Sequence, residues 1–208
     1  MPCTTYDAKK IICPLGLEVQ KIHACRNHCI LYRNKNANLL ACPECKSPRF
    51  KNNDRLKEGE ELKKGIPALV MWYLPIIPRL KCFFANPRDA ELTCWNEDKR
   101  KKDRMPRHPT DAMQWRKIDT IYPTFGGDPR NLRFGLSTDG MNPYGDWNSK
   151  HSTWPVLLCM YNLPPWLCMK RKYIMMPILI QGSKQLGNDI DVFLEPLMED
   201  FATLESRG

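Results

Sequence analysis

Two pairs of closely spaced cysteines near the start of the chain constrain its folding more than any other feature. Cys25-x3-Cys29 is followed, after twelve residues, by Cys42-x2-Cys45. Each pair can occupy two corners of a tetrahedron around a metal ion, and the short loop brings the two pairs together. The spacing therefore predicts a zinc-ribbon-like module over residues 1–50, with these four cysteines as zinc ligands.

Two alternatives to a four-cysteine zinc site stay open at this point. Either His23 or His28 replaces one cysteine, or the thiols are buried without a metal. The N-terminus lacks the basic-then-apolar order of a secretion signal, so we expect an intracellular protein with free thiols and no disulfides. The other six cysteines have no ligand-like spacing and are expected to be core or incidental residues: Cys3, Cys13, Cys82, Cys94, Cys159 and Cys168.

Positive charge is concentrated in the first half of the chain. Residues 1–110 hold 22 Lys and Arg against 12 Asp and Glu, whereas residues 111–208 hold 10 against 11. A basic segment attracts polyanions such as nucleic acid, because neutralising phosphates releases counterions. The alternative is a lysine-rich surface that only keeps the protein soluble. No apolar run approaches the roughly 18 uncharged residues of a membrane span, and no motif indicates a small-molecule substrate.

Residues 51–110 are expected to form a basic, proline-rich connector. Residues 51–64 are highly charged and predict an exposed helix or linker. Prolines recur from residue 66 to residue 110 and predict irregular structure, because proline interrupts helices and strands. The basic run at 99–102 is a candidate for nuclear import or phosphate binding, with a solvated loop as the alternative.

Residues 111–208 show the pattern of a folded α/β unit. A short helix is predicted over Asp111–Ile118, with Thr110 as its cap. Three apolar runs rich in β-branched and aromatic residues follow, separated by Gly, Pro and Asn turn signals. They predict strands at Leu132–Thr138, Trp154–Leu163 and Tyr173–Ile180.

An amphipathic helix is predicted to follow the third strand. Asp189 and Asp191 are its candidate caps, and Pro196 is tolerable only if it lies in the first turn. The apolar residues recur at helical spacing and predict the buried stripe: Leu194, Leu197, Met198 and Phe201.

Three consecutive strands followed by a helix match the start of an RNase H-like domain, in which an antiparallel meander leads into a helix. The expected fold class is therefore α/β (α+β), with a small zinc-binding module before an incomplete RNase H-like domain. Pro177 fits this topology if the third strand lies at a sheet edge, because proline in sheets is confined to edges and bulges. Many other α/β folds begin in the same way.

An acidic residue follows the first of these strands. In the segment 135–140, Gly-Leu-Ser-Thr-Asp-Gly, the apolar run ends on Asp139. A carboxylate fixed at a strand end can bind a divalent metal ion for phosphoryl transfer, while the glycine leaves room for substrate. Asp139 is thus a candidate metal ligand and catalytic residue. The alternative is an ordinary Asp-Gly hairpin turn.

Ordered motifs that cover the chain to about residue 200 match one known family. The first half contributes Tyr6, Lys9-Lys10, Leu15-Gly16-Leu17, Ile22-His23-Ala24-Cys25, Cys29-Ile30-Leu31-Tyr32-Arg33, Cys42-Pro43-Glu44-Cys45 and Leu74-Pro75-Ile76-Ile77-Pro78-Arg79-Leu80. The second half contributes Arg107-His108-Pro109-Thr110-Asp111, Asp128-Pro129-Arg130-Asn131-Leu132-Arg133, Leu136-Ser137-Thr138-Asp139-Gly140-Met141-Asn142-Pro143, Trp154-Pro155-Val156, Tyr161-Asn162-Leu163-Pro164-Pro165-Trp166 and Gly187-Asn188-Asp189-Ile190-Asp191. These motifs resemble those of CACTA-type (En/Spm-like) plant DNA transposases.

The resemblance implies a nuclear DNA transposase whose three acidic residues bind two divalent ions, Mg²⁺ or Mn²⁺, for DNA strand cleavage and transfer. Asp139 matches the first of these acids. In the family the next acid follows a fourth strand after the helix that ends near Ser206, so we expect a truncated, catalytically inactive fragment. The chain departs from the family pattern at Cys94-Trp95-Asn96, where Trp-His is usual, and over residues 201–208.

The resemblance also implies DNA as the main partner, with homo-oligomers or other transposase subunits as further candidates. The alternative function is a non-enzymatic, zinc-containing DNA-binding or partner-binding protein derived from a transposase. A stable fold with affinity for zinc and DNA would favour this alternative.

Overall fold

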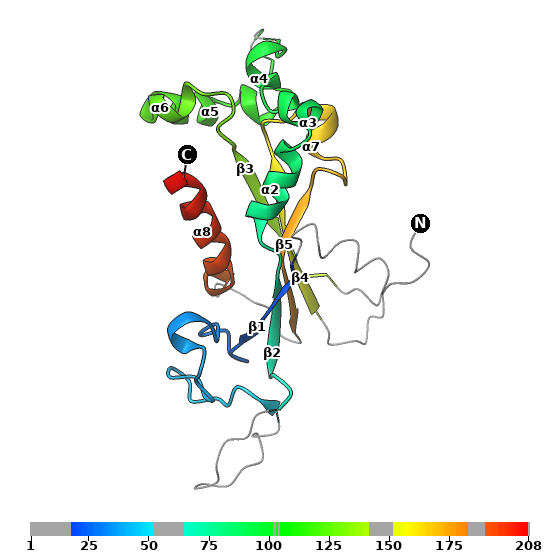
Figure 1. The fold of residues 1–208 in the computed structure, drawn as a ribbon. Coiled ribbons are helices and arrows are strands. Elements are labelled where there is room, and N and C mark those ends of the chain that lie inside the picture. Colours follow the sequence, from blue (N-terminus) through cyan, green and yellow to red (C-terminus); the bar gives the residue numbers. More distant parts are fainter. Residues whose placement is uncertain are drawn as a thin grey trace, which may run out of the picture. The chain divides into compact units, whose positions relative to one another are not determined.

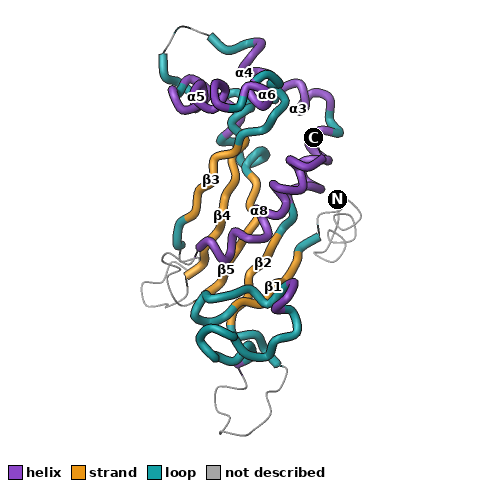
Figure 2. The backbone as a smooth tube through the Cα atoms, turned by 90° about the vertical axis from the view of Figure 1, so that its left-hand side faces the viewer, coloured by secondary structure: helices purple, strands orange, loops and turns teal. Residues whose placement is uncertain are grey.

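The computed structural model describes residues 18–51, 65–101, 103, 105–141, 152–182 and 190–207. These residues form a mixed α/β structure around a five-stranded antiparallel sheet (Figure 1). The order across the sheet is β1-β2-β5-β4-β3 (Figure 2). The strands are β1 (Gln20–Ala24), β2 (Leu69–Tyr73), β3 (Phe134–Thr138), β4 (Ser152–Met160) and β5 (Met175–Gly182).

Strands β3, β4 and β5 confirm the three strands expected from the sequence, and they are neighbours as a meander requires. The expectation that the third strand lies at an edge is wrong, because β5 is between β2 and β4. The Pro177 carbonyl accepts a hydrogen bond from Leu74 N at 2.7 Å, one residue beyond β2. In an antiparallel pair, the N–H and C=O groups of one residue face the same neighbouring strand. Pro177, which has no N–H, therefore faces the chain just past the end of β2, where no further ladder hydrogen bond is needed.

Strands β1 and β2 extend the sheet with residues for which the sequence analysis predicted no strand. In β2, Leu69, Met71 and Tyr73 are buried and alternate with partly exposed residues, which is the period of a strand with one buried face. Met71 pairs with Ile22 on one side and with Ile180 on the other. The sequence analysis missed this strand because the alternation in β2 is only five residues long and lies among prolines, which predicted irregular structure.

The expectation of irregular structure from residue 66 to residue 110 is wrong. Prolines there begin helices: Pro78 lies in the first turn of α2, and Pro87 is the first residue of α3, which Asn86 caps by accepting from Arg88 N at 3.1 Å. Proline in a first turn removes no intrahelical hydrogen bond. Residues 52–64, expected to be an exposed helix or linker, lie outside the described residues. The helices of this region are α2 (Ile76–Phe84), α3 (Pro87–Leu92) and α4 (Trp95–Asp98).

The chain divides into two compact units built from segments that are distant in sequence. Unit 1 comprises Met1–Ile77, Thr138–Val156 and Pro177–Gly208, and unit 2 comprises Pro78–Ser137 and Leu157–Met176. The division into three domains expected from the sequence, residues 1–50, 51–110 and 111–208, stays a prediction.

Helix α8 (Ile190–Arg207) confirms the predicted helix after the third strand, but its buried stripe differs from the expected one. Phe193 and Leu197 are fully buried, whereas Met198 is 46% exposed. Asp191 is an exposed residue of the first turn, and Asp189 lies outside the described residues. Neither α8 nor any other described helix is long and apolar enough to cross a membrane.

Pro196 lies in the interior of α8, so the expectation that it must be in the first turn is wrong. An interior proline removes one backbone hydrogen bond and costs roughly 3 kcal/mol. Packing in unit 1 offsets this cost. The Tyr73 hydroxyl lies 2.6 Å from Asp200 Oδ2 and 3.1 Å from the Pro196 carbonyl, and Asp200 Oδ2 also accepts from Ile76 N at 2.9 Å.

In unit 2, Thr110 does not cap the predicted helix. It lies in a 3-10 turn, Pro109–Asp111, whose cap is His108: the imidazole accepts from Thr110 N and the Asp111 carboxylate accepts from His108 N at 3.1 Å. The residue before the helix is Ala112, which offers no side-chain cap. The remaining helices of unit 2 are α5 (Met113–Ile121), α6 (Pro123–Gly126) and α7 (Pro165–Cys168).

Candidate metal centre

Four cysteine sulfur atoms converge in unit 1. The Sγ atoms of Cys25, Cys29, Cys42 and Cys45 all lie within 4.8 Å of one another, and those of Cys25 and Cys45 are 3.4 Å apart. Zinc–sulfur bonds of about 2.3 Å in a tetrahedron separate neighbouring sulfurs by roughly 3.8 Å. The cluster therefore has the size of a four-thiolate site and can hold a metal ion such as zinc. Its members are the four cysteines that the spacing in the sequence predicts.

Two tight turns place these sulfur atoms. Cys42 N donates to the Ser47 carbonyl at 2.9 Å and Lys46 N donates to the Cys42 carbonyl at 3.0 Å. In the first pair, His28 N donates to the Cys25 carbonyl at 3.0 Å. His28 and Lys46 have φ angles of 64° and 60°, a left-handed conformation that costs a residue with a side chain about 1–2 kcal/mol. Contacts elsewhere in the module must hold both turns in place.

Neither neighbouring histidine belongs to the sulfur cluster. His28 is buried, and its ring packs edge-to-face on Phe193 with 5.6 Å between ring centroids. His23 Nδ1 accepts a hydrogen bond from Arg49 Nε at 3.0 Å, and its ring packs on Phe50. This placement disfavours the alternative in which a histidine replaces one of the cysteine ligands.

Arg49 joins the parts of the module that surround the sulfur atoms. Its Nη1 donates to the Ala37 carbonyl at 2.6 Å, and its guanidinium carbon lies 4.7 Å from the centre of the Tyr32 ring. Tyr32, Cys25 and Cys42 form a small buried cluster. Arg49 therefore covers the apolar side of the cysteine site by a cation–π contact.

Burial and mutual proximity shift the pKa values of these thiols in opposite directions. Burial raises the pKa of the Cys25 thiol to about 11, and it raises that of Cys29 well above its ordinary value. Burial also acts to raise the pKa of Cys45, but hydrogen bonds from Ser47, Cys25 and Asn27 together lower this pKa to about 5. Several thiolates at this spacing require a positive ion to compensate their charge, and metal binding releases the protons.

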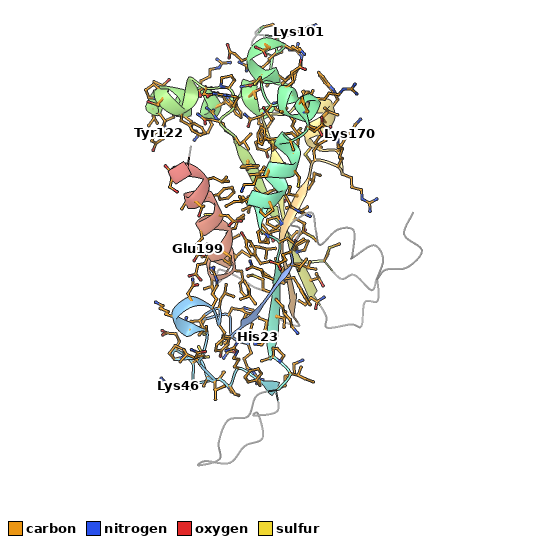
Figure 3. All side chains as sticks on the ribbon, viewed as in Figure 1. His23, Lys46, Lys101, Tyr122, Lys170 and Glu199 are labelled. Carbon is orange, nitrogen blue, oxygen red and sulfur yellow. The ribbon has the colours of Figure 1, made fainter. Side chains whose placement is uncertain are left out.

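The cysteine module, residues 18–51, is attached to α8 within unit 1. The Glu199 carboxylate forms an ion pair with Arg33 and accepts from Asn34 Nδ2 at 3.2 Å (Figure 3). Arg33 and Glu199 are 166 residues apart along the chain. Together with the contact between His28 and Phe193, this ion pair makes the module and α8 parts of one compact body.

Asp139 is exposed and directly follows β3. Pairing between the strands continues beyond it, because Met141 and Thr153 form an antiparallel bridge. The interpretation of Asp139-Gly140 as the hairpin turn is therefore wrong. A Cβ atom on Gly140 would lie 2.7 Å from the Trp154 ring, so the glycine makes room for this indole. Among the described residues, Asp139 does not form a cluster with two other potential metal ligands.

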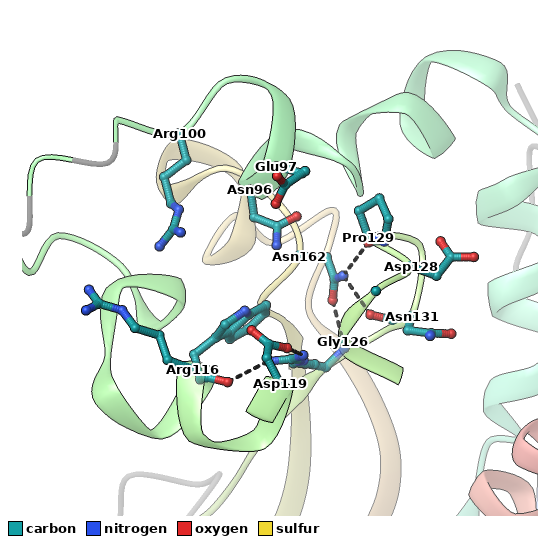
Figure 4. A pocket seen from close by; sticks show the side chains of 13 residues that line it. Asn96, Glu97, Arg100, Arg116, Asp119, Gly126, Asp128, Pro129, Asn131 and Asn162 are labelled. Atoms are coloured by element: carbon teal, nitrogen blue, oxygen red, sulfur yellow. Dashed lines mark hydrogen bonds and ion pairs between the residues drawn. The ribbon is translucent and has the colours of Figure 1, made fainter. Parts of the chain in front are cut away.

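A polar cavity of about 270 Å³ lies in unit 2, between α4, α5, α6 and the loop that follows α6 (Figure 4). The sequence analysis predicted none of its residues as a site. It is lined by Asn96, Glu97, Arg100, Trp115, Arg116, Asp119, Gly126, Gly127, Asp128, Pro129, Asn131, Arg133 and Asn162.

An ion pair, a cation–π contact and hydrogen bonds connect several of the residues that line this cavity. Arg133 forms an ion pair with Asp119, and its guanidinium carbon lies 4.0 Å from the centre of the Trp115 ring. Asn162 Oδ1 accepts from Arg133 N at 2.7 Å, while its Nδ2 donates to the Asn131 carbonyl at 2.9 Å. The sequence signals were the motifs over residues 128–133 and 161–166, which contain several lining residues but to which no role was attached.

A family model described as Transposase family tnp2 matches residues 103–208, which is 106 of the 208 residues. The chain belongs to this family. No curated protein and no solved structure matches the chain. Asp139 and most of the cavity lining lie inside the matched part of this transposase-family chain, whereas the four clustered cysteines precede it.

Proposed function

We propose that this transposase-family chain binds DNA and takes part in cut-and-paste transposition of the CACTA (En/Spm-like) type in a plant nucleus. The observation that carries the proposal is the family match over residues 103–208. The formal net charge of +9 supports it, because a cationic protein attracts the phosphate backbone.

The cysteine cluster is proposed to bind one structural zinc ion through Cys25, Cys29, Cys42 and Cys45. Four thiolates complete a zinc tetrahedron and leave no open position for a substrate, so such an ion stabilises a fold and does not catalyse. The ion would fix the two turns of the module that docks on α8.

Asp139 is proposed as a ligand of catalytic Mg²⁺ or Mn²⁺ in an RNase H-like domain. The ions would polarise a phosphate group and activate the attacking oxygen. One carboxylate is too little to hold two ions about 4 Å apart. Asp139 therefore acts with further acids, and we propose that the 208-residue chain alone does not cleave DNA.

The basic region is proposed to supply phosphate contacts. Lys81, Arg88 and Lys101 are exposed and form no ion pair with another described residue. Three other cations already form ion pairs. Two of them, Lys99 and Arg100, belong to the run at 99–102, so this run offers less unpaired positive charge than its sequence indicates. These pairs are Lys99 with Glu91, Arg100 with Asp111 and Arg107 with Asp103.

A second candidate is a non-enzymatic, zinc-containing DNA-binding or partner-binding protein derived from a transposase. The four-sulfur cluster favours it, because a structural zinc module needs no catalytic acids. A second copy of the chain and other transposase subunits are the proposed protein partners. Metal-dependent nicking of DNA by the chain itself would contradict this candidate and the proposed inactivity alike.

Fluorescence anisotropy with a labelled DNA duplex tests DNA binding. Three phosphate contacts by themselves account for a fall in affinity of roughly 40-fold between about 50 and 200 mM salt. The triple variant Lys81→Ala, Arg88→Ala, Lys101→Ala should reduce the salt dependence, whereas the exposed neutral substitution Gln114→Ala should not. Absence of binding at low salt, or binding that ignores salt, would contradict the proposal.

A further inference from the structure

Trp166 exposes a large aromatic surface in unit 2. It lies on α7, in the connection between β4 and β5, and is 60% exposed. Its ring packs edge-to-face on Trp95, at 5.7 Å between ring centroids, and Trp95 in turn packs on His108. Trp95 is buried, so it holds Trp166 from one side and leaves the remaining ring surface open to a ligand.

Two basic residues follow Trp166 in a tight turn. Lys170 N donates to the Leu167 carbonyl at 2.8 Å, and the Lys170 carbonyl accepts from Tyr173 N at 2.8 Å. Lys170 and Arg171 are exposed at this turn, and Lys170 is labelled in Figure 3. Because the turn begins at the end of α7, both cations lie within five residues of Trp166.

The buried carboxylate of Asp89 anchors this turn to α3. Asp89 is 8% exposed and accepts hydrogen bonds from Lys172 Nζ at 3.0 Å and from the Tyr173 hydroxyl at 3.0 Å. The charge of Lys172 is therefore neutralised within the protein. Neither Lys170 nor Arg171 forms a salt bridge with a carboxylate in the described part of the chain.

An exposed indole that is followed within five residues by two exposed cations has the chemistry of a single-stranded nucleic-acid contact. Bases stack on aromatic side chains, while cations track the phosphates on either side. In a duplex each base face is covered by its neighbours, so an aromatic ring can stack on a base only where the base is unpaired or displaced.

We propose that the segment from Trp166 to Arg171, here called the β4–β5 tip, contacts unpaired DNA. Trp166 stacks on one unpaired base, and Lys170 and Arg171 bind the flanking phosphates. This inference rests on the proposed DNA-binding function. It adds which part of the chain contacts the DNA and that the contacted DNA is unpaired. A protein partner is the competing occupant, since Met169 is also 66% exposed. Two exposed cations that form no salt bridge with a described carboxylate favour the polyanion.

The test compares binding of the full chain to a blunt DNA duplex and to the same duplex with a single-stranded overhang, by fluorescence anisotropy. The wild-type chain should prefer the overhang. Trp166→Leu keeps apolar contact with Trp95 but has no aromatic face, and should bind the overhang about 5- to 160-fold more weakly, the range for loss of one stacked base. Trp166→Phe should restore most of the preference.

The double variant Lys170→Ala, Arg171→Ala should weaken binding to the overhang DNA more than to the blunt duplex, and should lower the salt slope for the overhang DNA by roughly 1.4, as two single-strand phosphate contacts predict. Tyr122→Ala is the matched control, because Tyr122 is an aromatic residue of unit 2 with 61% exposure, and it should leave the preference unchanged. Circular dichroism checks that each variant is folded.

Three outcomes separate the hypotheses. If wild type binds DNA and Trp166→Leu retains the overhang preference, the β4–β5 tip is not the contact, although the proposed function stands. If the wild-type chain binds neither DNA, the proposed function fails together with this inference. If the tip variants change self-association in sedimentation experiments but leave DNA affinity unchanged, the tip is a protein interface and the inference is overturned.

Discussion

Met141 and Thr153 exchange two backbone hydrogen bonds, of 2.9 and 2.8 Å, although β3 ends three residues before Met141. Asp139 and Gly140 therefore interrupt the pairing between β3 and β4 and do not end it. Backbone pairing on both sides restrains Asp139 while its side chain stays exposed. A ligand of a catalytic metal ion needs this combination of a fixed backbone and an accessible carboxylate.

We expect Asp139→Asn to change the free energy of unfolding by less than about 0.5 kcal/mol, because the side chain is exposed and makes no turn. In a catalytically active member of this family, the same substitution at the matching position should abolish metal-dependent DNA cleavage, since it removes the charge proposed to hold the ion. Urea unfolding and a plasmid-nicking assay measure the two effects.

Gly140→Ala is the matched control for Asp139→Asn, one residue away. Its added methyl group meets the Trp154 ring at 2.7 Å, and such overpacking typically costs about 1–3 kcal/mol. If Asp139→Asn destabilises the chain as much as Gly140→Ala does, Asp139 has a structural role and the metal-ligand proposal loses its support.

Purified protein is expected to contain one zinc ion per chain, and Cys42→Ser should lose it, because three thiolates and a hydroxyl bind zinc more weakly than four thiolates. Plasma emission spectrometry measures the metal. Cys82→Ser, at an exposed cysteine outside the cluster, should retain it. A wild-type chain that folds without any metal would refute the zinc site.

The stability of unit 2 is expected to decrease in acid because of His108. Burial lowers the pKa of His108; the charge of Asp111 opposes this shift and that of Arg100 adds to it. The unfolded chain thus binds a proton at higher pH than the folded one. The contribution of His108 is fully present above about pH 6.5 and is lost as pH falls through the folded-state pKa, which thermal unfolding from about pH 7.5 to 5 measures.

His108→Asn provides the comparison, because asparagine keeps an acceptor for Thr110 N at the helix cap but does not titrate. The variant should show a flatter dependence of the unfolding temperature on pH. Burial also lowers the pKa of His23, and since His23 is unchanged in the variant, the difference between the two curves reports His108. Identical curves would show that His108 is not the titrating group.

Tyr73→Phe is expected to lower the free energy of unfolding by about 1–3 kcal/mol, because the Asp200 carboxylate loses a buried hydroxyl donor. Burial and the hydrogen bond to Asp200 both raise the pKa of Tyr73, so the hydroxyl stays protonated at neutral pH. Urea unfolding of Tyr122→Phe gives the control, since Tyr122 is 61% exposed. Equal effects of the two substitutions would show that the contact with Asp200 contributes nothing.

The features that the sequence predicted correctly are local ones. The spacing of Cys42 and Cys45 requires a tight turn whatever surrounds it, and alternating apolar residues bounded by turn signals predict β3, β4 and β5. Local periodicity likewise predicted α8. Each of these signals depends on residues only a few positions apart, so no knowledge of distant contacts was needed.

The tertiary structure decided the features that depend on distant segments. Met71 pairs with Ile180, which makes β5 an internal strand and places Pro177 at the end of β2 instead of a sheet edge. His28 is turned to Phe193, and not to the cysteine sulfurs, by the packing of α8. Such pairings follow from which apolar surfaces are buried together, and spacing along the chain does not encode them.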